Sequence, residues 1–228
     1  MSRIDKFKSY LSNDEKFFLE GLEPSIFNFF DEAVDKNIVN IIFTPYQINR
    51  LIKLIDSSNS AKKLYNNLIG VIDGDQELIK HKINALEELD INLDGKQIGT
   101  IVCHNYQVIA ERLKLYLVTF LDFDVNVKDA HKKPLGRILN QLQDEFPKNK
   151  FIQSLNTNIR NSVTHYTYFF EDKYNKIHLC NGVFDYSPNI MKLSEFRKNS
   201  NELNILTEAF FIIYKDKFFP GDNLFLDK

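Results

Sequence analysis

The sequence has no tryptophan and only two cysteines in 228 residues, Cys103 and Cys180. Two cysteines without a CxxC spacing exclude a disulfide-stapled scaffold and a cysteine-based zinc module. The first residues, MSRIDKFKSYLSNDEKFF, are charged throughout and lack the apolar run of a signal peptide. We therefore expect a cytoplasmic protein.

Long hydrophobic runs are also missing. No window approaches the ~18 uninterrupted apolar residues of a membrane-spanning helix, so we expect no membrane partner. Hydrophobic residues make up 43% of the chain and charged residues 26%, close to the averages for soluble globular proteins, which excludes wholesale disorder. Twenty phenylalanines and ten tyrosines predict an aromatic core.

The chain lacks a strong overall charge, because its formal net charge is −2. This balance excludes a general electrostatic grip on nucleic acid but not a local one. Residues 125–165 carry 7 Lys and Arg against 3 Asp and Glu, whereas residues 1–124 carry 14 against 19. A solvated charged face beside a loop would give the same charge pattern. The basic segment supplies the weak candidates for substrate binding: Lys132, Lys133, Arg137, Lys148 and Lys150.

Apolar residues at spacings of three and four predict a mainly all-α chain, a helical bundle with one small β-hairpin. A polar turn at about 92–96 suggests a helical extension at 1–95 and a helical domain at 96–228, with the hairpin inserted near 166–181. In the helix at 14–36, Pro24 should kink or divide the helix. The expected helices cover 14–36, several segments between 44 and 91, 97–121, 134–145, a segment from about 148 to 163, and 193–217.

Several familiar site patterns are incomplete. The stretch DGDQE begins like a calcium loop, but Leu78 and Asn84 stand where Gly and Glu are needed. The stretch KKPLGR lacks the glycines and the Lys-Ser/Thr of a phosphate loop. His178 and Cys180 would share one strand face without a second pair of ligands. The sequence therefore predicts no metal site and no cofactor.

One polar group ends the helix expected from about residue 148: Arg160, Asn161 and His165. On a helix, positions 160 and 165 point about 140° apart, so the two side chains do not form a tight pair within one helix. The ordinary alternative is a surface salt bridge by Arg160, a local cap by Asn161 and a helix end at His165. From spacing alone both interpretations stay open.

The chemistry of this group suits RNA cleavage without a metal. Arginine offers a permanently charged fork for a phosphate, and histidine titrates near neutral pH and serves as a general base or acid. Asparagine can orient a hydroxyl or the imidazole. A base that deprotonates the ribose 2′-OH starts its attack on the adjacent phosphate, while the arginine stabilises the developing charge.

Arg160, Asn161 and His165 in IRNSVTHY, between a long helix and a final helix, resemble the signature of the HEPN superfamily. The resemblance covers about residues 96–217 and implies an all-α bundle of HEPN type acting as a metal-independent endoribonuclease in defence, toxin–antitoxin systems or RNA processing. It implies a homodimer that joins two motifs in one cleft, with Arg160 on the scissile phosphate, Asn161 positioning the phosphate or the histidine, and His165 as acid and base.

The resemblance also leaves a second class of function open. Some proteins of this fold are non-catalytic modules that bind RNA, a nucleotide or a protein. A protein partner would then be an antitoxin or a nucleotidyltransferase-like protein. A third possibility is a helical scaffold without a role in nucleic-acid chemistry.

Overall fold

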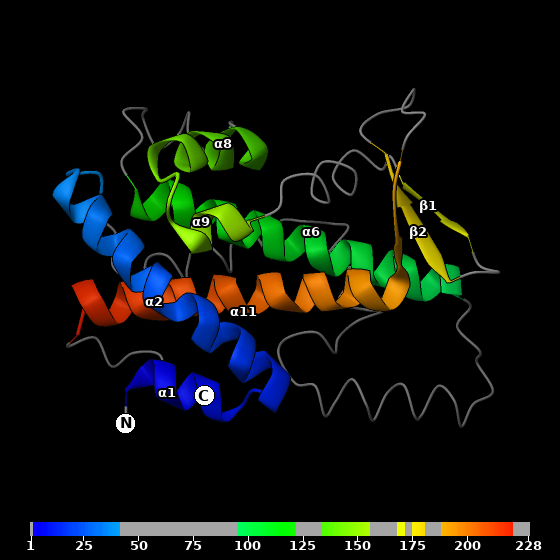
Figure 1. Ribbon diagram of the computed structural model, residues 1–228, viewed down its shortest axis with the longest axis horizontal. Coiled ribbons are helices and arrows are strands. Elements are labelled where there is room, and N and C mark those ends of the chain that lie inside the picture. The colour runs from blue at the N-terminus through cyan, green and yellow to red at the C-terminus, as the bar shows by residue number, and fades with distance from the viewer. Residues whose placement is uncertain are drawn as a thin grey trace, which may run out of the picture.

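The protein is mainly helical and carries one small antiparallel sheet (Figure 1). The computed structural model describes residues 2–41, 95–121, 134–155, 168–171, 175–180 and 188–220. This architecture confirms the expected mainly all-α fold class. The helices expected between 44 and 91 lie outside the described residues. Among those described, no helix is long and apolar enough to cross a membrane. The described helices are α1 (Arg3–Ser9), α2 (Asn13–Asp35), α6 (Gly95–Phe120), α8 (Leu135–Glu145), α9 (Lys150–Ser154) and α11 (Leu193–Phe218).

Helices α1 and α2 each begin with a capping box, formed by Ser2 with Asp5 and by Ser12 with Glu15. In this arrangement the serine side chain and the acidic side chain satisfy each other's backbone N–H groups. The sequence analysis did not expect α1, and α2 lies within one residue of the expected 14–36. Helix α2 continues through Pro24 as a single helix, so of the two expected effects, a kink or a division, the division does not occur. Proline removes only one helical hydrogen bond, and buried side chains before and after it hold both halves in the core.

Helices α6 and α11 lie side by side and run in the same direction (Figure 1). The parallel direction follows from three pairs of stacked rings, in which a later residue of α6 always pairs with a later residue of α11. Parallel neighbours need a long crossover, and here the connection carries α8, α9 and the sheet. The ring pairs and their centroid separations are Tyr106–Phe196 at 5.8 Å, Tyr116–Phe211 at 4.9 Å and Phe120–Tyr214 at 3.7 Å.

The C-terminal part of α6 is buried on every side, from Leu115 to Leu121. The Thr119 hydroxyl donates to the Leu115 carbonyl at 2.6 Å, which satisfies a polar group in this apolar setting. At the end of the helix, the Asn40 amide donates to the Phe120 carbonyl at 2.7 Å. The end of α6 is therefore tied to the residues that follow α2.

Side chains of α1 and α2 enter the same hydrophobic core as α6, α8, α9 and α11. Phe30 of α2 stacks on Phe210 of α11 with ring centroids 4.7 Å apart. Polar contacts add to this packing, since the Arg3 guanidinium lies 2.6 Å from the Asp216 carboxylate. The described part of the expected extension is thus packed into the bundle, while the expected boundary near residue 95 borders residues outside the described ranges.

Helix α9 is shorter than expected. It begins at Lys150 and ends at Ser154, where Leu155 takes an extended conformation with ψ 97°. The expectation of one continuous helix from about 148 to 163 is therefore wrong. The physical reason lies in α8, where the Gln143 side-chain amide donates to the carbonyls of Ile152 and Leu155, each at 3.3 Å. These bonds satisfy carbonyl groups at the point where the helix stops. Phe151, Ile152 and Leu155 are buried.

The sheet contains the expected hairpin, β1 (Tyr168–Glu171) and β2 (Lys176–Leu179), and a third strand, β3 (Asn189–Lys192). All neighbouring strands are antiparallel, in the order β1-β2-β3. Asn175 precedes β2 with φ 51°, a left-handed conformation that asparagine tolerates better than most residues. Ile177 and Leu179 point into the core, so one face of the sheet is buried and the other faces outward.

Candidate nucleic-acid interface

The expected catalytic residues Arg160, Asn161 and His165 lie outside the described residues, in the segment 156–167. Lys132 and Lys133, two of the weak candidates for substrate binding, lie outside them as well. Their roles therefore stay predictions. The structure does describe the chain on both sides of the motif and the remaining three basic candidates.

The two ends of the motif segment are anchored at different levels of the bundle. Before it, Phe151 packs against Phe210 of α11 with ring centroids 5.4 Å apart. After it, Tyr168 forms a side-chain hydrogen bond with Cys103, near the start of α6. Since Tyr106 lies beside Phe196, these two levels are separated by about 14 helical residues, or roughly 20 Å along α11.

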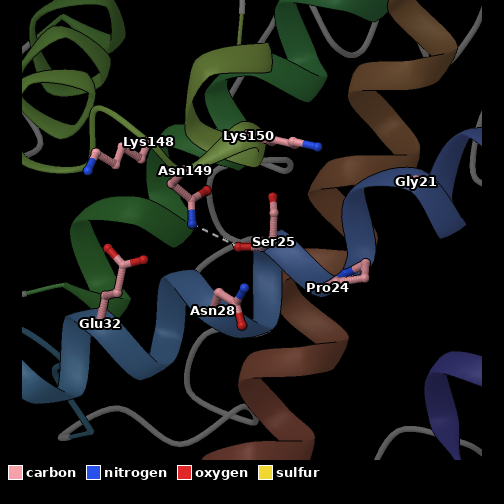
Figure 2. A pocket seen from close by; sticks show the side chains of 8 residues that line it. All are labelled: Gly21, Pro24, Ser25, Asn28, Glu32, Lys148, Asn149 and Lys150. Atoms are coloured by element: carbon pink, nitrogen blue, oxygen red, sulfur yellow. Dashed lines mark hydrogen bonds between the residues drawn. The ribbon is translucent and has the colours of Figure 1, made fainter.

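Two of the basic candidates, Lys148 and Lys150, line a cavity of about 320 Å³ between α2 and the start of α9 (Figure 2). One wall comes from α2 and the other from the turn that leads into α9. Polar and apolar atoms contribute about equally to its lining. The residues that line it are Gly21, Pro24, Ser25, Asn28, Glu32, Lys148, Asn149 and Lys150.

Asn149 fixes the wall between the two lysines. Its Oδ1 atom accepts from the Ile152 amide at 3.2 Å and caps α9, and its Nδ2 atom donates to the Ser25 carbonyl at 2.9 Å. The side chain of Ser25 adds a second link to this turn, because its hydroxyl oxygen accepts from the Phe151 amide at 2.6 Å. Asn149 is only 5% exposed. The turn that carries both lysines is thereby held firmly against α2.

Lys148 and Lys150 are exposed and point in opposite directions from Asn149 (Figure 2). They do not converge on one point, so the cavity is not a two-lysine clamp for a single anion. Glu32 lines the same cavity and lowers its positive charge. Two ammonium groups on either side of a rigid turn suit separate phosphates of an extended polyanion better than one small anion.

The structure does not bring the third candidate into this cavity. Arg137 is exposed on α8, away from the residues that line it. Sequence reasoning missed Ser25, Asn28 and Glu32, because α2 was treated as part of a separate extension. Asn149 carries a detectable signal, since an asparagine before a short apolar run is a typical N-cap. Its contact with α2 had no comparable signal in the sequence.

His178 is described and lies on β2. Its Nε2 atom is 3.1 Å from a carboxylate oxygen of Glu171, and its ring stacks on Phe169 with centroids 4.3 Å apart. Within the described ranges, no three His, Cys, Asp or Glu side chains are grouped so that they could hold a metal ion.

Comparisons with protein-family models, with curated proteins and with solved structures found no match to this chain.

Proposed function

We propose that this protein is a metal-independent endoribonuclease that cleaves RNA through attack of a ribose 2′-OH. The observation that carries the proposal is the motif Arg160-Asn161-x-x-x-His165, which closes the one basic segment of the chain and precedes the final helix. Two chains in a homodimer would bring two motifs into one composite cleft. The biological setting in this proposal is a toxin–antitoxin or antiviral defence system, with an antitoxin or a nucleotidyltransferase-like protein as partner.

In the proposed reaction, His165 of one chain takes the proton of the 2′-OH and the 2′-oxygen forms a bond to phosphorus. The bond from phosphorus to the 5′-oxygen breaks, and His165 of the second chain gives a proton to the leaving oxygen. The products are a 2′,3′-cyclic phosphate and a free 5′-OH. Arg160 stabilises the negative charge on the phosphoryl oxygens, and Asn161 positions the phosphate or the imidazole.

The described part of the chain supports this proposal in two ways. The long helix and the final helix expected around the motif are present and packed together. Lys148 and Lys150 add exposed positive charge shortly before the motif.

The test is cleavage of a labelled single-stranded RNA in the presence of EDTA. We expect cleavage by the full chain and a loss of at least about 100-fold in rate for His165→Ala and for Arg160→Ala. The expected RNA ends are a 2′,3′-cyclic phosphate and a 5′-OH, which phosphatase and kinase treatment distinguishes. An all-DNA strand lacks the 2′-OH and should stay intact.

Two matched control variants remove an arginine or a histidine that lies outside the motif. Arg197→Ala removes an exposed arginine of α11, and His104→Gln replaces a histidine of α6. Both should keep the wild-type rate. An unchanged rate in either motif variant would remove that residue from the mechanism. RNA binding without cleavage by the wild type would favour the non-catalytic binding module.

A further inference from the structure

On the outward face of the sheet, two exposed apolar side chains flank a histidine. The register places Phe169, His178 and Ile190 opposite one another across β1, β2 and β3. Phe169 is 53% exposed and Ile190 is 50% exposed, whereas Ile177 and Leu179 on the other face are buried. An aromatic ring, an imidazole and an aliphatic side chain therefore lie next to one another on one face of the sheet.

The geometry of this row leaves one aromatic face open. Phe169 stacks on His178 with ring centroids 4.3 Å apart and an interplanar angle of 16°. Among the strands that the structure describes, β1 lies at the edge of the sheet, so none of them pairs on the other side of Phe169. A flat ring placed there would extend the stack of His178 and Phe169 by one layer. Nucleobases have such rings, and stacking on aromatic side chains is a common way to hold unpaired bases.

The charges on this face fit a polyanion. Among the strand residues of the sheet, Glu171 is the carboxylate, and its side chain is engaged by His178 at 3.1 Å. Lys176 and Lys192 share the row of Glu171 across the strands, and Lys192 is exposed at the point where β3 meets α11. An ammonium group within reach of a stacked base can contact the phosphate next to it.

We propose that this face binds single-stranded RNA, with an unpaired base stacked on Phe169 and a neighbouring phosphate on Lys192. The proposal rests on the proposed function in that RNA is the substrate, and it names the unpaired strand as the form recognised. Strand β1 begins three residues after His165 in the chain. The stacked base would thus be held close in sequence to the expected catalytic motif.

The test measures binding separately from cleavage. The full-length protein is titrated into a fluorescein-labelled oligouridylate of 12 residues in which every ribose carries a 2′-O-methyl group, and anisotropy gives Kd. The methyl group blocks the 2′-oxygen, so cleavage cannot affect the result. We expect Phe169→Ala to weaken binding about tenfold, within the range found for loss of one stacked base. Phe169→Tyr should restore the wild-type Kd, because it keeps the ring.

Two further variants separate stacking from general effects. Phe17→Ala removes a phenylalanine of α2 that is 81% exposed and far from the sheet in sequence, and it should leave Kd unchanged. Lys192→Gln should weaken binding a few-fold and lower the dependence of Kd on salt. Phe169→Leu keeps apolar bulk without an aromatic ring, so it stands in for Phe169→Ala if circular dichroism shows that the alanine variant is unfolded.

The outcomes separate this inference from the proposed function. A Phe169-dependent Kd in a protein that cleaves no RNA would keep the stacking face and overturn the ribonuclease proposal. Cleavage of RNA with the same Kd in wild type, Phe169→Ala and Phe169→Leu would overturn the stacking face alone. Absence of binding by the wild type, or equal losses in Phe169→Ala and Phe17→Ala, would also overturn the stacking face.

Discussion

At the scale of single residues, Asn149 joins α9 to α2, two helices that lie far apart in the sequence. It caps α9 with one amide atom and holds the Ser25 carbonyl of α2 with the other, across 124 residues of chain. A buried amide with both functions satisfied is costly to remove, since the partners lose their hydrogen bonds in a place without water. The position of Lys148 and Lys150 depends on this side chain.

Replacing this side chain should therefore destabilise the fold. Asn149→Ala should lower the free energy of unfolding by about 2 kcal/mol, the sum of a lost N-cap and a lost buried hydrogen bond. Urea unfolding followed by circular dichroism measures the change. Asn140→Ala is the matched control, because Asn140 is exposed on α8. Equal stability of wild type and Asn149→Ala would contradict the anchoring role.

The buried thiol of Cys103 should make the free energy of unfolding depend on pH in the alkaline range. Burial raises the pKa of its thiol from 9.0 to about 12, against a smaller opposing effect of the hydrogen bond from Tyr168. Above pH 9 the unfolded chain loses this proton while the folded chain keeps it, so stability that is complete below pH 9 falls as pH rises toward 12. The folded-to-unfolded ratio should decrease by up to about tenfold per pH unit.

Urea unfolding of wild type and Cys103→Ala between pH 8 and 10 measures this dependence. The alanine variant loses some packing at every pH, but its stability should decline less steeply above pH 9. Burial also raises the pKa of Tyr214, which adds its own decline only above pH 10. Parallel pH profiles for the two proteins would show that the thiol is not protected in the folded state.

At the scale of elements, hydrophobic periodicity located four helices within two residues of their bounds. Helices α2, α6, α8 and α11 each bury several side chains along their length, so their pattern repeats often enough to be recognised. The elements missed or misjudged are short. Helix α1 and strand β3 offer too few residues for a period, and α9 ends because Gln143 of another helix contacts its carbonyls. Contacts between elements leave no mark in a local pattern.

The same limit applies to the candidate site. Positive charge indicated Lys148 and Lys150 from the sequence, and the structure places both on one cavity. Their partner wall in α2 could not be inferred, because the Asn149–Ser25 contact depends on how α9 docks. The row of Phe169 and His178 could be recognised only from the strand register, and the sequence-based prediction did not include β3.

Phe210 tests how the helices depend on one another. Its ring contacts Phe30 of α2, Phe120 of α6 and Phe151 of α9, with centroids between 4.7 and 5.8 Å away. Phe210→Ala should lower the free energy of unfolding by about 3–5 kcal/mol, as expected for an aromatic side chain that is fully buried. Phe27→Ala on α2 is the control, since Phe27 is 37% exposed. A loss no larger than that of the control would contradict the central position of this ring.

At the scale of the whole molecule, α1 and α2 are part of the helical bundle and contribute side chains to its core. Helix α2 covers Phe210 with Phe29 and Phe30, and α1 adds the ion pair of Arg3 with Asp216. The paired rings of α6 and α11 lie about 90 residues apart in the chain, so this helix pair is held together by contacts between distant segments. Such a pair relies on the surrounding layers for its burial.

A fragment that begins at residue 95 should consequently fail to form the native bundle. Without α2, the rings of Phe210 and Phe151 lose a covering layer, and Asn149 loses its partner in α2. Together these losses are comparable with the whole stability of a typical domain, about 5–15 kcal/mol. Calorimetry of the full chain should show one cooperative transition, and the fragment 95–228 should show none. Removal of residues 2–12 alone takes away α1 and the Arg3 ion pair, so that variant should melt earlier but still cooperatively. A fragment 95–228 that melts cooperatively with wild-type helical content would instead establish an independent domain with an N-terminal extension.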